Sequence, residues 1–507
     1  MLRYSLIGIA LFLVLSGKAQ NDQDALRYSQ IGFGGTSRSK AMGGSFGALG
    51  ADGSCMSINP AGIGLYKKGD VNISFGLRFF GVNSKYQNTS TNDFKASLIY
   101  DGFSLTTAWD SKQKPESHNA FGISVNQLAN FNSNTTIIGY SRNSRTQDML
   151  AQTTNTSPKN LDGSYSGLAF QNYILDTIDG HYYSFVDPTK SVRQKDQIQT
   201  SGHYNELCLN YAYGYMDKLY IGATLGIPIV NYNYTSTYTE TDDKDSMRIT
   251  YNASNNTVSS TYPYSLYYYT GLGGFKEFTY TESYKTTGTG FDLKLGAIYR
   301  LTDYLRVGAS YQSPTIIKLT DTYLYQLSST FDEGPGSSTQ YPPDNGGRFS
   351  YKIITPQRIT GSVAFLYKKF GAINVDYESV NYGQASIQNI SGGTYQADFS
   401  GVNTTIRNKY TRTSNLRVGA EVNIKPMFIR LGYAMYGSPY GDTFTGSLVR
   451  NYASGGFGFR NNKFYVDISL LKQFGTENYY MFNPKYVQKA ILTNSGTTIA
   501  VSIGCKF

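Results

Sequence analysis

A strict alternation of apolar and polar residues recurs along most of the chain and constrains its fold more than any other feature. Successive side chains of a strand point to opposite faces, so a period of two indicates strands with one apolar and one polar face. A wall between lipid and water needs such faces. The sequence therefore predicts an all-β fold, a transmembrane antiparallel β-barrel. The alternation is clearest at residues 71–79, 207–215, 219–227, 291–299 and 305–311.

The alternating segments number about fourteen, and an even number is typical of bacterial outer-membrane barrels. The barrel is expected over residues 68–507, in the outer membrane of a Gram-negative bacterium, where membrane lipids surround it. The predicted strands span residues 68–84, 95–110, 117–131, 202–216, 218–240, 275–301, 304–325, 347–368, 371–390, 408–425, 427–437, 452–461, 463–475 and 496–507.

The predicted connections alternate between short and long, as periplasmic turns and extracellular loops do. This parity places both chain ends on the periplasmic side. The two largest loops, near 132–201 and 241–274, either fold over the mouth of the barrel or form a mobile, solvated surface. Short connections lie at 111–116, 217, 302–303, 369–370, 426 and 462, and longer ones near 85–94, 132–201, 241–274, 326–346, 391–407, 438–451 and 476–495.

The two ends of the chain resemble an export signal and a barrel-assembly signal, respectively. Residues 1–19 have a positive start at Arg3, an apolar stretch and small residues before Ala19, which predicts a signal peptide cleaved after Ala19. The last strand alternates up to Phe507, and a terminal aromatic resembles the signal read by the barrel-assembly machinery, an expected partner during biogenesis. After residue 20 no run approaches the about 20 apolar residues that a membrane helix needs.

Composition argues against several other functions. The net charge of +10 is spread along the chain without a basic block, so nucleic-acid binding is not expected. The three cysteines are an odd number without metal-type spacing, and the three histidines accompany no catalytic motif. We therefore predict that the protein is not an enzyme and holds no cofactor and no metal ion.

Residues 20–67 do not look like a spanning strand. They are rich in small residues, and Pro60 would break a central strand. We expect this segment, called the hatch below, to form a compact plug of short helices and turns inside the lumen, with glycines that allow close backbone packing.

Here the sequence resembles a known family. The hatch motif Asn59-Pro60-Ala61, placed just before the first strand, is similar to that of the FadL-type outer membrane transport proteins, which carry long-chain fatty acids or other hydrophobic compounds. The resemblance covers nearly the whole mature chain. Further similar segments are the hairpin 296–311, Thr355-Pro356 with residues 375–377, and residues 416–421 and 429–433.

The resemblance implies a monomeric barrel of fourteen strands that takes up hydrophobic small molecules passively. It implies a pocket beside the hatch and a lateral exit at the third strand. Here that strand carries Asn126, Gln127 and Asn130, which mark either an opening or the interfacial end of an ordinary strand. Members of the superfamily in Bacteroidetes, one a shuttle protein of a secretion system, share the barrel without known fatty-acid uptake. The alternative function is therefore a non-transporting barrel that binds or shuttles proteins for secretion.

Transport of an amphipathic anion needs an apolar slot with cations at its polar end. Each candidate has a structural alternative: the slot residues could simply pack the hatch against the wall, and the cations could form a salt-bridge ladder with Asp292, Asp376, Glu421 and Asp467. Arg or Lys facing lipid at the midplane costs about 2–4 kcal/mol, so the cations are placed in the lumen. The candidates are Phe46, Leu49, Met56, Ile58, Ile63 and Leu65 for the slot, and Lys294, Arg358, Arg417 and Arg430 for the cations.

Overall fold

The computed structural model describes residues 21–111, 116–178, 180–247, 251–252, 257–258, 273–344, 346–390, 397–441 and 448–507. The expected signal peptide, residues 1–19, lies outside this part of the chain. Among the described helices, none combines the length and the apolar character needed to cross a membrane.

The wall is a closed antiparallel barrel of fourteen strands, as the alternation predicts. β1 (Asp70–Tyr86) pairs on one side with β2 (Thr89–Asp110) and on the other with β23 (Ala490–Lys506), so the sheet closes on itself. Closure leaves no sheet edge exposed to lipid, where an unpaired backbone group costs several kcal/mol.

Four of the fourteen wall strands are interrupted and therefore appear as two labelled strands each: β3 with β4, β12 with β13, β15 with β16, and β17 with β18. The remaining wall strands and the extra hairpin strand β14 have these bounds: β3 (Ser117–Asn130), β4 (Ser133–Ser141), β7 (Val192–Tyr215), β8 (Leu219–Thr241), β11 (Gly273–Arg300), β12 (Leu305–Gln312), β13 (Ile316–Glu333), β14 (Ser337–Tyr341), β15 (Gly347–Ile354), β16 (Arg358–Tyr367), β17 (Gly371–Asn381), β18 (Ser386–Asn389), β19 (Arg412–Ile424), β20 (Met427–Tyr436), β21 (Val449–Arg460) and β22 (Phe464–Tyr479).

Two of the interruptions lie side by side at prolines. Pro314 separates β12 from β13, and Pro356 separates β15 from β16 in the neighbouring wall strand. Proline cannot donate to the ladder. The backbone N–H of Thr355 donates to the carbonyl oxygen of Thr315 at 3.0 Å, and the backbone N–H of Thr315 donates to the Thr355 hydroxyl at 3.1 Å. Pairing therefore resumes on both sides of one shared break.

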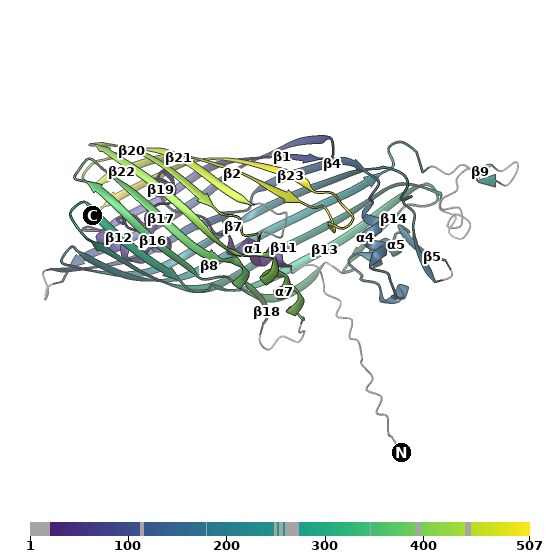
Figure 1. Cartoon of the computed structure of the whole chain (residues 1–507), viewed down its shortest axis with the longest axis horizontal. Helices are drawn as coiled ribbons and strands as arrows, with labels where there is room; N and C mark the ends of the chain where they lie inside the picture. The colour runs from purple at the N-terminus through teal and green to yellow at the C-terminus, as the bar shows by residue number, and fades with distance from the viewer. Residues whose placement is uncertain are drawn as a thin grey trace, which may run out of the picture.

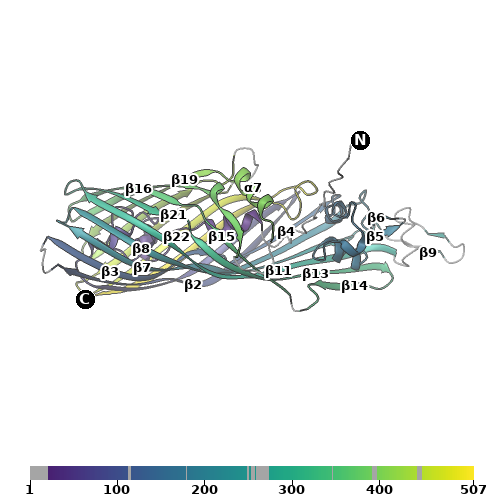
Figure 2. The same ribbon diagram turned by 90° about the horizontal axis from the view of Figure 1, so that it is seen from below.

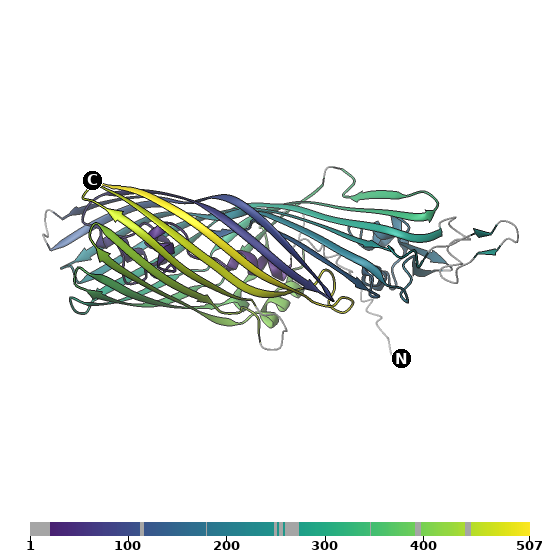
Figure 3. The same cartoon turned by 90° about the horizontal axis from the view of Figure 1, so that it is seen from above.

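The wall is much taller on one side than on the other (Figure 1). β11 has 28 residues and β7 has 24, whereas β16 and β20 have 10 each. A tilted strand of about 9–11 residues crosses the hydrocarbon core. The short strands thus fit the membrane, and the long ones continue well beyond it on the extracellular side (Figure 3).

Outward-facing side chains form the apolar belt that contacts lipid. On β11 the outward residues Phe291, Leu293 and Leu295 are exposed, while the intervening Asp292 and Lys294 are buried in the lumen. The same division holds on β20, where Ile429 and Leu431 face out. This belt makes the chain an outer-membrane barrel.

Above the belt the strands run further than predicted. The expected loop at 85–94 is wrong, because β1 continues to Tyr86 and β2 begins at Thr89. Past the membrane the outward face meets water instead of lipid. Val82 and Tyr86 there point inward into a buried core while Asn83 points out, so the polarity that marked the strand is reversed.

The hatch lies inside the barrel and crosses it from the extracellular half to the periplasmic end (Figure 2). Its helices are α1 (Asp22–Ser29), α2 (Ser37–Ala41), α3 (Cys55–Ile58) and η1 (Pro60–Leu65). α2 packs on β20–β23, while η1 packs on β7, β8 and β11 of the opposite wall. The expected periplasmic position of both ends holds for Phe507. It does not hold for Asp22, which bonds Lys409 and Tyr410 at the extracellular start of β19.

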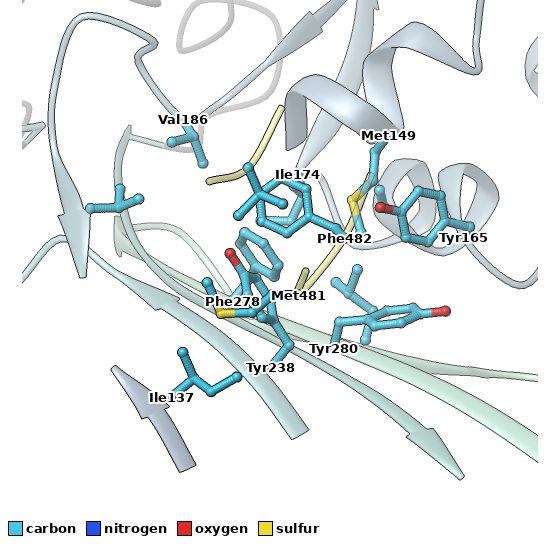
Figure 4. Close-up of a cluster of buried hydrophobic side chains, with 14 of the residues drawn as sticks. Ile137, Met149, Tyr165, Ile174, Val186, Tyr238, Phe278, Tyr280, Met481 and Phe482 are labelled. Atoms are coloured by element: carbon cyan, nitrogen blue, oxygen red, sulfur yellow. The ribbon is translucent and has the colours of Figure 1, made fainter. Parts of the chain in front are cut away.

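The large loop after the third wall strand folds over the mouth and is buried there; we call residues 142–191 the cap. It contains α4 (Arg145–Ala151), η2 (Pro158–Asn160), α5 (Ser166–Gln171), β5 (Leu175–Ile178) and β6 (His181–Ser184). Figure 4 shows Met149, Tyr165 and Ile174 of the cap packed against Tyr238 and Phe278 of the tall wall. Much of the second large loop, 241–274, lies outside the described residues.

A buried arginine fixes the cap to the wall. The guanidinium of Arg145 lies over the rings of Tyr165, Tyr238 and Tyr280, 4.4–5.2 Å from their centroids. Its backbone N–H donates to Glu240 at 2.7 Å. Desolvated cation–π contacts are worth about 2 kcal/mol or more, so these contacts hold the cap firmly on the tall wall.

The belt yields a stability prediction. Leu295→Arg should lower the free energy of unfolding by about 2–4 kcal/mol, because the cation would face the hydrocarbon core. The matched control, Thr281→Arg, changes an outward residue of the same strand above the belt and should cost less than about 1 kcal/mol. Denaturant unfolding in phospholipid vesicles measures both, and equal losses would contradict the placement of the belt.

Candidate functional site

The backbone ladder of the wall is incomplete between β2 and the third wall strand. β2 pairs with β3 only from Asp110↔His118 up to Gly102↔Asn126. Above that point β4 pairs with β7 alone among the described strands, and residues 89–101 of β2 pair with β1 alone. This stretch of wall therefore lacks the hydrogen bonds that close the barrel elsewhere.

A bulge lies on each side of the break. In β2 the register shifts at Asp101, since Ser74 pairs with Gly102 and Phe75 with Tyr100. In β3 the register against β7 shifts at Leu128. A bulge turns one residue out of the ladder and bends its strand. Here the two bulges leave the carbonyl oxygens of Asp101 and Leu128 free to accept hydrogen bonds from another partner.

The hatch provides that partner. The backbone N–H of Gly32 donates to the carbonyl oxygen of Leu128 at 2.8 Å, and the backbone N–H of Gly35 donates to that of Asp101 at 3.3 Å. A Cβ on Gly34 would lie 2.0 Å from the carbonyl oxygen of Gln127, so only glycine allows this approach. The hatch residues 32–35 therefore close the lower part of the break.

Side chains close the rest of it. The buried carboxylate of Asp101 pairs with Lys40 of the hatch. Higher up, the Asp93 carboxylate of β2 accepts hydrogen bonds from the backbone N–H of Thr136 at 2.6 Å and from its hydroxyl at 2.9 Å. Between these two contacts Lys95 of β2 donates to the carbonyl oxygen of Thr200 at 2.7 Å, so side chains rather than strand pairing join the two edges there.

A cavity of about 320 Å³, the outer cavity, lies at the break on the extracellular side. Its wall includes Gln30 of the hatch, residues 130–133 of the third wall strand and apolar side chains from several strands. It falls within the size range of small-molecule sites, about 300–1,000 Å³. The apolar and aromatic lining residues are Phe80, Phe131, Ile198, Leu448, Tyr479 and Leu492.

The outer cavity holds two arginines and one carboxylate. Arg78 donates to the side-chain oxygen of Asn130 at 3.0 Å and to the carbonyl oxygen of Asn132 at 2.9 Å, and it lies 4.2 Å from the ring centroid of Phe80. Neither Arg78 nor Arg450 forms an ion pair with a residue that the structure describes. Glu477, whose carboxylate accepts a hydrogen bond from Asn494 at 3.1 Å, balances one of the two arginines, so one positive charge remains in excess.

A second, inner cavity of about 40 Å³ lies on the other side of the hatch segment 31–34, which lines it together with Leu128. It brings together three of the predicted cations, Lys294, Arg358 and Arg417. Only the hatch at 30–34 and the third wall strand at 128–131 separate it from the outer cavity.

The three cations of the inner cavity are already paired. Lys294 contacts Glu206 at 2.5 Å and Asp292 at 2.7 Å. Arg358 contacts Glu378 at 2.8 Å, and Arg417 lies 3.6 Å from Asp376 and 3.7 Å from Glu378. Four carboxyl groups thus face three cations, which leaves no net positive charge for an anionic ligand.

Arg430, the fourth predicted cation, lies away from both cavities. It contacts Glu421 and Asp467 at 2.6 Å each, and Glu421 also binds Arg38 of the hatch at 2.9 Å. This is the arrangement of a ladder that joins hatch and wall. Its role in ligand binding stays a prediction.

The predicted slot residues pack the lower hatch against the wall. Phe46, Met56 and Ile63 are fully buried in one cluster with Leu49, and Leu65 packs beside a neighbouring cluster. The exception is Ile58, which lines the inner cavity. Apart from Ile58, the structure therefore does not bring the slot residues into one pocket with the cations, and ligand binding by the slot stays a prediction.

The hatch motif fixes a turn. The side-chain oxygen of Asn59 accepts from the backbone N–H of Ala61 at 3.2 Å, and its amide donates to the carbonyl oxygen of Gly47 at 2.6 Å. Pro60 takes the first position of η1, where its missing N–H costs nothing.

Several residues of the site were not among the sequence candidates. Arg78 lies on the polar face of the first strand, so alternation alone could have placed it in the lumen with the other cations. Asp101 and Leu128 carried no such signal, because a one-residue bulge leaves no trace in composition. The Gly32-Phe33-Gly34-Gly35 run was a detectable sign of close backbone contact.

Comparison with known proteins identifies solved structures that share this fold. No protein-family model matches the sequence, and no curated protein matches it either. Solved structures do match. A Pseudomonas aeruginosa FadL homologue gives a TM-score of 0.54 at 14% identity, covering 94% of this chain and 100% of its own. The Pseudomonas putida toluene transporter TodX gives 0.52 at 12% identity, covering 94% and 99%.

The chain has the FadL fold. At such low identity the likeness extends to the architecture and leaves the ligand open. The FadL-fold barrel described here has a wall break and two cavities that its own residues define.

Hatch attachment can be tested at Asp376. Its buried carboxylate accepts from the backbone N–H groups of Phe46 and Gly47 at 3.1 Å each. Asp376→Asn should speed amide exchange at both positions by at least about tenfold, since hydrogen bonds to charged groups contribute about 1.5–3 kcal/mol. Hydrogen-exchange mass spectrometry measures this. Ser379→Ala, on the outward face of the same strand, should change nothing, and unchanged exchange in Asp376→Asn would refute the attachment.

Proposed function

We propose that the protein takes up hydrophobic compounds passively across the outer membrane. The observation that carries this proposal is the wall break, which hatch residues 32–35 close instead of strand pairing. Compounds enter the outer cavity, pass where the hatch now lies, and leave sideways into the membrane. The FadL fold supports the proposal, because TodX is described as a toluene transporter.

Energetics favour a hatch that opens. A ladder of backbone bonds between strands separates only when many bonds break together. Here two backbone bonds, the Lys40–Asp101 pair and ring contacts of Phe33 with Tyr436 and Tyr452 hold the hatch at the lower break. Each neutral hydrogen bond contributes about 0.5–1.5 kcal/mol. Thermal motion can therefore displace residues 32–35 while the rest of the barrel stays closed.

The two cavities differ in net charge and therefore in the ligand group that each can bind. The outer cavity, with Arg78 and Arg450 against Glu477, suits the carboxylate of a fatty acid whose chain packs on the apolar lining. The inner cavity has its cations paired and lies where an opened hatch would widen it. The proposed substrate class is thus amphipathic anions such as long-chain fatty acids, together with uncharged hydrophobic compounds.

A reversible tether tests the lateral route. Gly32→Cys with Leu128→Cys joins the hatch to the third wall strand where their backbones are already bonded at 2.8 Å, with Cys505→Ser in the background. Oxidation should stop uptake of a fluorescent fatty acid and of toluene into cells, and reduction should restore both.

The control tether fixes the hatch elsewhere. Ser37→Cys with Ser502→Cys links α2 to β23, where the backbone N–H of Ser37 donates to the Ser502 hydroxyl at 2.6 Å. Oxidation there should leave uptake unchanged. Full uptake through the oxidised first tether, with the disulfide verified by mass spectrometry, would refute the lateral route and favour the shuttle function.

The role of the outer cavity is tested by Arg78→Gln. The apparent dissociation constant for a long-chain fatty acid should rise at least about tenfold, since a charge-assisted hydrogen bond of about 1.5–3 kcal/mol is lost. Toluene binding should stay the same, because it has no charge. Isothermal titration in detergent measures both, with Arg407→Gln on α7 (Ser400–Lys409), outside both cavities, as control. An equal loss for both ligands would contradict the anion site.

A further inference from the structure

The outer face of the tall wall carries a cluster of cations just above the apolar belt. Lys285 of β11, Lys318 of β13, and Arg348 and Lys352 of β15 alternate with inward residues and so point away from the lumen. The first three are exposed and Lys352 is partly so. None of the four forms an ion pair with a residue that the structure describes.

Strand register brings these side chains together. Lys318 and Lys352 are directly opposite each other on β13 and β15. Lys285 and Arg348 flank Thr322 from the two sides, two same-face ranks of the sheet above Lys318. Side chains opposite on neighbouring strands lie about 4.5–5.5 Å apart at Cβ, and like charges there are destabilising. Such a cluster calls for an anion that the chain itself does not supply.

The height of the cations above the apolar belt indicates where along the wall that anion lies. Two residues below Lys318 and Lys352 on their strands lie Ile316 and Ile354, and Ile316 pairs with Phe291 at the top of the belt. Lys318 and Lys352 therefore lie about 6–7 Å along their strands from the last lipid-facing apolar side chains, at a rise of about 3.3 Å per residue. Lys285 and Arg348 are six residues from Phe291 and Ile354, about 20 Å along their strands. The first pair lies at the level of lipid headgroups and the second pair in the layer above them.

Above Lys318 and Lys352 the same face carries mainly hydroxyl and amide groups, with Leu324 as an apolar exception, and has no outward acid until Glu277 on β11 and Asp332 on β13. These polar residues lie opposite one another on neighbouring strands: Thr281 of β11, for example, pairs with Thr237 of β8 and with Gln326 of β13. Other members of this polar face are Thr235, Thr239, Thr279, Ser283, Thr287, Thr320, Thr322 and Ser350.

We propose that this strip of β11, β13 and β15 binds a phosphorylated glycolipid of the outer leaflet. Acyl chains lie on the apolar belt, phosphates lie on the four cations, and sugars lie on the hydroxyl and amide face. From the membrane outward the strip presents apolar side chains, then cations, then hydroxyl and amide groups, which is the order of acyl chains, phosphates and sugars in such a lipid. Arg and Lys are good hydrogen-bond donors to phosphate. The site is separate from the lumen and does not depend on transport.

The test compares two triple variants with equal charge change. K285Q/K318Q/K352Q removes three of the four cations of the cluster. K85Q/R412Q/K472Q removes three outward cations on other strands: Lys85 and Arg412 near the extracellular ends of β1 and β19, and Lys472 in the middle of β22. Both are titrated in detergent with fluorescent lipid A that carries both phosphates. The cluster variant should bind about a hundredfold more weakly, at about fivefold per lysine, and the control within about twofold of the unmodified protein.

The unmodified protein supplies a second measurement that no folding defect can affect. Lipid A stripped of its phosphates should bind it about as weakly as intact lipid A binds the cluster variant. Equal weakening in the two triple variants would overturn the proposal. So would equal affinity of the unmodified protein for intact and dephosphorylated lipid A. Heat-modified mobility in gels confirms that each variant is a folded barrel.

Discussion

The structure depends on one constraint: a backbone polar group that faces lipid must find its hydrogen bond within the protein. Strand pairing meets this constraint from β1 to β23 around most of the wall. It is not met between β2 and the third wall strand, where two bulges turn carbonyl groups inward. The hatch satisfies the Asp101 and Leu128 carbonyls there, so this stretch of wall is closed by a segment that is not itself part of the wall.

The charged interior follows from the same constraint. Charges cannot face lipid, so they gather in the lumen, and burial requires that they be paired. Glu421 links Arg38 of the hatch to Arg430 of the wall, and Asp376 holds the hatch backbone. Pairing leaves the inner cavity without spare positive charge. Arg78 donates to Asn130 and Asn132, forms no ion pair with a described residue, and remains for the outer cavity.

Alternation predicted the barrel, the turns and the lumen-facing residues, because inside and outside differ in polarity along every spanning strand. It failed at residues 85–94, where water lies outside and the buried core lies inside. It also gave no sign of the cap, whose apolar residues Met149, Leu168 and Ile174 follow no regular period. The partners of Lys294 and Arg417 were beyond sequence reasoning, since they are fixed by contacts between distant strands.

The paired interruptions at Pro314 and Pro356 divide the two wall strands that carry them at one level. Below this level the strands β12 and β16 match the thickness of a bilayer; above it β13 and β15 belong to the extracellular wall. The neighbouring strand β11 runs unbroken past this level and pairs with β12 below it and with β13 above it. One continuous strand therefore keeps the extracellular wall in register with the membrane-embedded cylinder while the two proline-bearing strands change direction beside it.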